Sequence, residues 1–93
     1  NKSITNISVS PNPFIIGKDE GITITNFPSN TTIQVITLKG KVVKEFKLTE
    51  QSSILNWDGR DKYGNYLNTG IYLIAGFSKE KKSGISKLAI IRN

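Results

Sequence analysis

The side chains whose types and spacing could support chemistry lie in one stretch, residues 57–72. Asp58, Asp61 and Asn65 supply carboxylate and amide oxygens in a glycine-containing loop, which is the kind of ligand set that Ca²⁺ binds. The spacing does not match an EF-hand loop, and no bidentate glutamate follows it. Because Asp and Asn are also the ordinary residues of turns, we expect turn chemistry here and no metal site.

Asp58 and Asp61 are also an acid pair of the type that a glycoside hydrolase needs. Such enzymes hold two carboxyls about 5–9 Å apart across a cleft, whereas these two acids fall within a predicted turn. The chain contains no histidine and no cysteine. This composition excludes Ser/His/Asp and Cys/His catalysis, thiolate metal sites and disulfide bonds within the chain. We therefore expect no catalytic residues, no cofactor and a protein that is not an enzyme.

The same stretch has the features of a long turn between two core strands. Trp57 can bury a large apolar area, and its indole N–H would then need a carbonyl partner. Asp58 is placed to accept backbone N–H groups, and Gly59 supplies a positive φ. Residues 61–65 are typical of a type I turn with glycine in the left-handed position. We expect Gly70 to begin the next strand at a place where a side chain would crowd the turn.

Hydrophobic alternation predicts short strands along the chain and almost no helix. The seven expected strands are residues 1–10, 21–27, 31–39, 42–48, 54–57, 71–77 and 85–91. The third and sixth of these have apolar residues on both faces, which indicates interior strands. Phe14 lies between the first two strands, and we expect it to turn inward and plug one end of the core.

The fold class that follows is all-β, a seven-stranded immunoglobulin-like β-sandwich. A true immunoglobulin domain would have a cysteine pair and a tryptophan on its third strand. Here cysteine is absent, and Trp57 falls on the fifth expected strand. Tyr72, near the start of the sixth expected strand, is placed to act as a tyrosine corner.

The length of 93 residues suits one domain with one modest core. We expect residues 1–3 to be the end of a linker from an upstream domain and residues 4–93 to form the domain. The first residues lack the apolar region of a signal peptide, and no apolar run approaches the ~20 residues that a membrane-spanning helix needs. Because the chain begins without Met, we expect it to be cut from a longer protein.

The chain carries 13 Lys+Arg against 7 Asp+Glu, a net charge of +6. If two lysine-rich hairpin tips lie at one end of the molecule, they would form a patch for anionic lipopolysaccharide, made up of Lys39, Lys41, Lys79, Lys81 and Lys82. Solvated lysines that limit aggregation are the more ordinary interpretation. No aromatic platform is interleaved with these lysines, so we expect no nucleic-acid partner.

Several motifs occur in a characteristic order along the chain. They are Pro-Asn-Pro-Phe at 11–14, Val-Ile-Thr-Leu-Lys-Gly-Lys-Val-Val at 35–43, Trp-Asp-Gly-Arg-Asp at 57–61, Gly-Asn at 64–65, Gly-Ile-Tyr at 70–72 and a basic-apolar end at 87–92. In this order they resemble the C-terminal sorting domain of type IX (Por) secretion cargo, which is similar in turn to the Ig-like domain of the flagellar hook-capping protein. The resemblance covers residues 7–92, and the order is more specific than any single motif.

This resemblance implies a non-catalytic module at the end of a large protein exported by Gram-negative, Bacteroidetes-type bacteria, either secreted or held at the outer-membrane cell surface. The implied partners are the secretion translocon and a sortase-like peptidase, with anionic lipopolysaccharide and the upstream domains of the same chain as further contacts. By position, the implied sorting residues are Gly70, Ile71, Tyr72, Lys87, Leu88, Ile90, Ile91 and Arg92.

The position of the last strand distinguishes a sorting function from a purely structural one. If it is an edge strand, its unpaired backbone groups could be recognised by strand addition, with Lys87 and Arg92 adding charge steering. The alternative is a structural or ligand-binding Ig-like domain, an inter-domain brace or a binder of anionic glycan, with no sorting role. Trp57, Tyr72 and the glycines would be needed for folding in either case. A last strand at the edge favours sorting, and one in the middle of a sheet favours the brace.

Overall fold

The structure is a computed structural model, and it describes residues 7–27, 30–48, 54–78 and 82–92. The described residues form strands and no helix. In chain order the strands are β1 (Ser8–Ser10), β2 (Phe14–Ile16), β3 (Ile22–Thr25), β4 (Thr31–Thr37), β5 (Val42–Lys47), β6 (Ile54–Trp57), β7 (Gly70–Ser78) and β8 (Lys82–Arg92).

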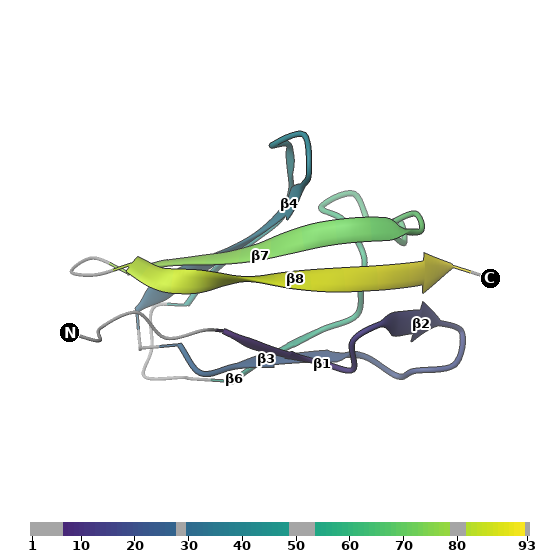
Figure 1. Ribbon diagram of the computed structural model, residues 1–93, viewed down its shortest axis with the longest axis horizontal. Coiled ribbons are helices and arrows are strands. Elements are labelled where there is room, and N and C mark those ends of the chain that lie inside the picture. The colour runs from purple at the N-terminus through teal and green to yellow at the C-terminus, as the bar shows by residue number, and fades with distance from the viewer. Residues whose placement is uncertain (1–6, 28–29, 49–53, 79–81, 93) are drawn as a thin grey trace.

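The strands form two sheets that lie one above the other (Figure 1). The three-stranded sheet has the order β1-β3-β6, and its strands are antiparallel. The five-stranded sheet has the order β2-β8-β7-β4-β5, and its neighbours are antiparallel except for β2, which runs parallel to β8. The all-β sandwich that the sequence predicts is therefore confirmed.

The number of strands differs from the prediction, because the described residues contain eight strands and not seven. The additional strand is β2, whose three residues are too few to show a β pattern between a proline and a glycine. It pairs with the end of β8, with Phe14 opposite Ile90 and Ile16 opposite Arg92. The chain thus changes sheets at residues 11–13, where proline ends β1 because it cannot donate to the ladder.

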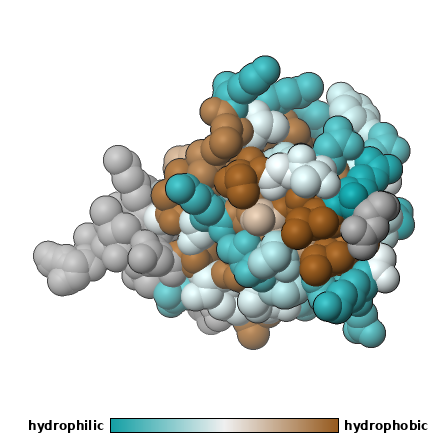
Figure 2. All heavy atoms as spheres, turned by 45° about the vertical axis from the view of Figure 1, so that its right-hand side comes forward, coloured by the Kyte–Doolittle hydropathy of each residue, from teal (hydrophilic) through white to brown (hydrophobic). Residues whose placement is uncertain are grey.

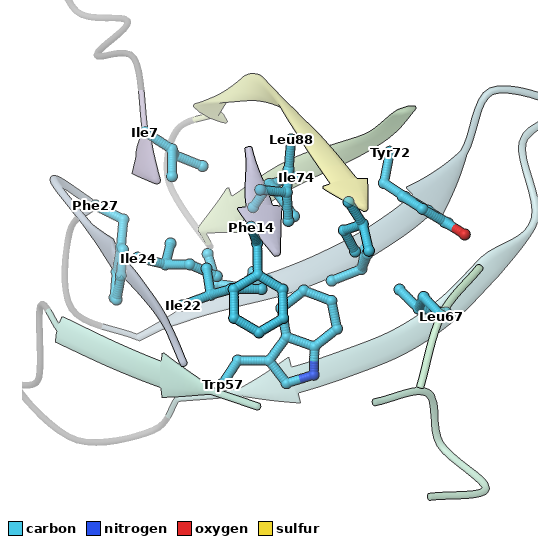
Figure 3. Packing of buried hydrophobic residues seen from close by; sticks show 13 residues of the cluster. Ile7, Phe14, Ile22, Ile24, Phe27, Trp57, Leu67, Tyr72, Ile74 and Leu88 are labelled. Carbon is cyan, nitrogen blue, oxygen red and sulfur yellow. The ribbon is translucent and has the colours of Figure 1, made fainter. Parts of the chain in front are cut away.

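The core lies between the two sheets, where alternate residues of each strand point inward. In β3, for example, Ile22 and Ile24 are buried while the threonines between them face outward. Figure 3 shows the aromatic rings of Phe14 and Trp57 pointing into this cluster. Its buried members are Ile7, Phe14, Ile22, Ile24, Phe27, Ile33, Val35, Trp57, Leu67, Tyr72, Ile74, Leu88 and Ile90. The inward position expected for Phe14 is confirmed.

Two further expectations about the sheet hold. β4 lies between β7 and β5, and β7 lies between β8 and β4, so both are interior strands. The hairpin between β4 and β5 is closed by the N–H of Gly40, which donates to the carbonyl of Thr37 at 2.9 Å, with Gly40 at a φ of +94°.

The described residues contain no helix long and apolar enough to cross a membrane. Residues 1–6 lie outside the described part of the chain, so the linker expected at residues 1–3 stays a prediction.

Candidate functional site

The long turn after β6 is built around the Trp57 indole. Its N–H donates to the carbonyl of Arg60 at 2.9 Å, so the buried ring has the carbonyl partner that its burial requires. Arg60 and Tyr66 then form an isolated antiparallel bridge, and the Arg60 guanidinium lies 4.6 Å from the centre of the Tyr66 ring. The hydrogen bond of the Trp57 indole and the contacts between Arg60 and Tyr66 therefore stabilise this turn.

The two acids of this turn accept hydrogen bonds from backbone N–H groups. Asp61 Oδ1 accepts the N–H groups of Tyr63 at 2.9 Å and Asn65 at 3.0 Å. Asp58 Oδ1 accepts the N–H of Arg60 at 3.1 Å. The bond from Asn65 is the main reason that the pKa of Asp61 lies below its ordinary value. These bonds are the turn chemistry that the sequence predicts.

The geometry gives no support to a metal or hydrolase site at this turn. Among the described residues, no three acidic side chains come together as metal ligands would. Asp58 lines an open hollow of about 410 Å³ together with Lys44, Phe46 and Trp57, but Asp61 does not line it. This hollow is therefore not a cleft shared by the two acids.

The glycines of this region have different roles. Gly59 and Gly64 have φ values of +85° and +89°, as expected for left-handed turn positions. Gly64 donates to the carbonyl of Asp61 at 3.0 Å and closes the turn. Gly70 begins β7 as expected, but the expected crowding is wrong: a Cβ there would meet its nearest neighbour, Tyr72 Cε1, at 3.8 Å, which is ordinary contact.

Tyr72 makes the bond of a tyrosine corner. Its hydroxyl donates to the carbonyl of Asn68, four residues upstream, at 2.8 Å. Burial is the main reason that the pKa of Tyr72 is raised. Tyr72 is 8% exposed and holds the turn on the core, and its sorting role stays a prediction.

The structure brings most of the implied sorting residues to one end of the five-stranded sheet. Gly70 pairs with Ile90, and Tyr72 pairs with Leu88. Arg92 connects this end to the turn, because its backbone N–H donates to Thr69 Oγ1 at 2.8 Å. Its guanidinium also donates to the side chain of Asn68 at 3.0 Å, as an exposed contact.

The side chains of these residues divide between core and solvent. Leu88 and Ile90 are 0% and 1% exposed, so a partner of the folded domain cannot contact them. Ile71 and Ile91 alternate with them and face outward, and Lys87 is exposed on the same outer face. Contacts with a partner are therefore left to the outward residues and to the strand edge.

The edge of β8 is covered over only part of its length. β2 pairs with its last three residues, of which Ile90 also pairs with β7. Just before this, the Asn12 side chain bonds the strand as another strand would, since its Nδ2 donates to the carbonyl of Lys87 at 2.9 Å and its Oδ1 accepts the N–H of Ala89 at 3.0 Å. No described strand pairs with the outer edge of β8 before Ile90.

Asn12 is a residue whose role the sequence did not indicate. It stands between two prolines that mark only a break in a strand, and a single sequence carries no signal for a bond to residues 87–89. Among the described residues, β8 is thus an edge strand at its start and an inner strand at its end. It therefore combines the edge position that favours sorting with the inner position that favours the brace.

Only part of the expected lysine patch falls within the described residues. Thr37, next to the hairpin of Lys39 and Lys41, pairs with Tyr72 at the start of β7. Thr31, at the other end of β4, pairs with Ser78, where β7 leads to the second cluster. Lys79 and Lys81 lie outside the described residues, and only the backbone of Lys82 is described. The two ends of β4 that lead toward the lysine clusters are about 20 Å apart along the sheet, and the joint patch stays a prediction.

Comparisons with known proteins place this chain among Ig-like domains. A solved structure of PorZ, an essential bacterial surface component of the type IX secretion system of Porphyromonas gingivalis, matches 92% of this chain with a TM-score of 0.77. The identity is 22%, so the likeness concerns the fold, and the match spans 11% of the PorZ chain. No curated protein sequence matches. The FlgD Ig-like domain family matches residues 18–76, more than half of the chain, and the chain belongs to that family.

Proposed function

We propose that this chain is a non-catalytic sorting and anchoring module of a larger exported protein, which it directs through the type IX outer-membrane translocon to the cell surface. The observation that carries this proposal is the fold shared with part of a type IX secretion component over 92% of this chain. The ordered motifs from Pro11 to Arg92 support it independently, because they include strand ends and turns that an Ig-like fold alone does not specify.

Recognition by the translocon and a sortase-like peptidase would use the part of β8 that no described strand covers. The Asn12 bonds show which backbone groups face this edge, namely those of Lys87 and Ala89. Because this alternation has a period of two, Ile85 presents its N–H and C=O to the same edge. An extended segment of the translocon would add to the sheet there, and Lys87 would steer acidic groups toward it.

After export, anionic lipopolysaccharide would meet the exposed hairpin between β4 and β5. Lys39 and Lys41 lie at this hairpin and are exposed. We assign this contact to the lysine hairpin that the structure describes. Because the contact is electrostatic, it would weaken with added salt.

Deleting the last strand cannot test this proposal, because Leu88 and Ile90 belong to the core. A better pair of variants is Ile85→Pro and Ile85→Ser in a reporter fused to the chain. Proline removes the outward N–H that strand addition needs but breaks no bond to β7. Serine removes the same apolar side chain and keeps the N–H. We expect export to fail for Ile85→Pro and to persist for Ile85→Ser, with both domains folded.

Equal export of the two variants would contradict recognition by strand addition at β8. A domain that serves only as an inter-domain brace would leave every version of the reporter in the periplasm.

A further inference from the structure

The outer face of β7 is apolar, although nothing in the described structure covers it. Tyr72 and Ile74 are buried and point into the core, so the residues that alternate with them point away from it. These include Ile71 and Phe77, which are 43% and 48% exposed. A strand that is apolar on both faces is the pattern of a sheet covered on both sides.

Neighbouring strands extend this apolar face. On β8, Ile85 is 54% and Ile91 is 37% exposed. Register places Ile91 beside Ile15 of β2, and Leu73 of β7 beside Ile36 of β4. The apolar face therefore crosses four adjacent strands, over about 14 Å, and extends about 20 Å along β7. Hereafter it is called the β7–β8 face.

The other sheet of the same molecule provides an internal comparison. Its outward positions on β1 and β3 are serines and threonines, and Thr23 donates to Asn56 Oδ1 of β6 at 3.2 Å. β1 and β3 thus follow the usual rule of apolar residues inside and polar residues outside, whereas Ile54 at the start of β6 is an outward apolar residue, 57% exposed. The β7–β8 face does not follow this rule, and Figure 2 shows hydrophobic residues in a broken brown area across the middle of the molecule, with hydrophilic residues around it. Exposed apolar residues gathered on one face in this way mark an interaction site.

The charges on this face indicate the chemistry of the partner. Lys87 lies beside Leu73 in the middle of the face, and Lys47 lies beside Thr32 near its margin. Glu45 is the acid on this side among the described residues, and it accepts a hydrogen bond from Gln34 at 2.8 Å. An apolar face with exposed lysines fits an acidic partner. A second copy of this chain would bring Lys87 against a face of the same charge, and each chain carries +6.

The open edge of β8 separates a protein partner from a lipid surface. The apolar face continues to the part of β8 that no described strand pairs with. Open sheet edges do not occur in contact with hydrocarbon, because unpaired backbone groups are costly there. A folded protein can cover the apolar side chains and offer polar partners to the edge.

We propose that the β7–β8 face is a docking surface for an acidic region of another folded protein that presents its own apolar side chains. Ile71, Phe77, Ile85 and Ile91 form the buried centre of the contact, and Lys87 pairs with a carboxylate of the partner. This inference does not rest on the proposed role in export, since a structural module would need the same covered face.

The test uses the full-length parent protein in its own cells. A photo-crosslinking amino acid is placed at Ile71, and a matched control is placed at Thr23 on the outer face of the other sheet. The crosslinked protein is identified, purified and mixed with the purified parent protein to measure affinity. We expect crosslinking from Ile71 and not from Thr23. Lys87→Glu should weaken binding on the order of tenfold, and a carboxylate-to-lysine change on the partner should restore it.

Folding of the variants is also checked in the 93-residue chain by itself, through the fluorescence of Trp57, its one tryptophan. Lys87→Glu changes an exposed side chain and should leave the melting transition in place. Ile85→Ser should weaken docking while it leaves export unchanged, which separates the two proposals. The proposal would be overturned by equal crosslinking from Thr23 or by a partner contact that Lys87→Glu leaves unchanged. It would also be overturned if the free protein sedimented as a dimer, or if it bound phosphatidylglycerol vesicles in a way that depends on Ile71.

Discussion

A Cβ atom on Gly59 would lie 2.7 Å from Cε2 of Phe14, closer than two carbon atoms can approach. This contact joins the turn after β6 to the short strand β2 near the start of the chain. The missing side chain of Gly59 therefore makes room for a buried ring that caps the core, in addition to providing a φ of +85°.

Gly59→Ala should destabilise the domain through both effects. The left-handed backbone costs alanine about 1–2 kcal/mol, and the clash with Phe14 should add about 1–3 kcal/mol. Gly64→Ala is the matched control, because Gly64 has nearly the same φ, +89°, and no atom within 4 Å of its Cβ. Urea unfolding followed by Trp57 fluorescence measures both. Equal losses of stability would show that Phe14 does not confine Gly59.

Gly70→Ala provides a second comparison. A methyl group at this position would meet Tyr72 at ordinary contact distance, and the backbone is not left-handed. We expect a change in the free energy of unfolding within about 0.5 kcal/mol, as for most mild surface changes. A loss comparable to that of Gly64→Ala would mean that the turn is tighter here than the structure describes.

Asn12→Ala should loosen the edge of β8. The substitution removes two hydrogen bonds to exposed backbone, worth about 1 kcal/mol in total. The specific signal is faster amide hydrogen exchange at Ala89, whose N–H loses its acceptor, while amides of β8 that bond β7 keep their protection. Asn12→Asp keeps an acceptor for Ala89 and should restore that protection in part. Unchanged exchange at Ala89 in Asn12→Ala would contradict the role of the side chain.

Tyr72→Phe should destabilise the domain by about 0.5–1.5 kcal/mol, the usual net value of one hydrogen bond. The ring and its packing remain, and the bond to the carbonyl of Asn68 is lost. Thermal unfolding measures the difference. Tyr66→Phe is the control, since the Tyr66 hydroxyl makes an exposed contact with Arg60 and its loss should change stability less.

Acid should remove the contribution of Asp61. Its pKa is lowered in the folded state from an ordinary value of 3.8, mainly by the N–H of Asn65 and also by those of Tyr63 and Gly64. Stability from this carboxylate is therefore present above about pH 4 and is lost as the pH falls through the lower folded value. Asp61→Asn should be less stable than the natural protein at pH 7, and the difference should shrink below pH 4. A difference that does not change with pH would contradict this assignment.

Local residue chemistry was sufficient to predict much of the fold. Alternation in residues 22–25 and the apolar faces of β4 and β7 are local patterns, and the structure confirms them. The carbonyl partner of Trp57 and the bond of Tyr72 were also predictable, because buried polar groups must be paired. The same alternation at residues 87–91 already places Leu88 and Ile90 on the core side.

The features that the sequence did not predict are contacts between distant parts of the chain. β2 is recognised as a strand only through its pairing with β8. The bonds of Asn12 depend on the path of residues 11–13 between the sheets. The position of the hairpin that carries Lys39 and Lys41 depends on strand order and not on its composition. The conflict at Gly59 with Phe14 likewise needs the three-dimensional structure.

Export can be measured directly with a folded reporter fused to the N-terminus of this chain. The fusion is expressed in two matched hosts, one with a working type IX translocon and one from which the translocon has been deleted. The proposed function predicts that the reporter reaches the cell surface or the medium in the first host and stays in the periplasm in the second. A reporter that stays in the periplasm of both hosts, or leaves both, would contradict it.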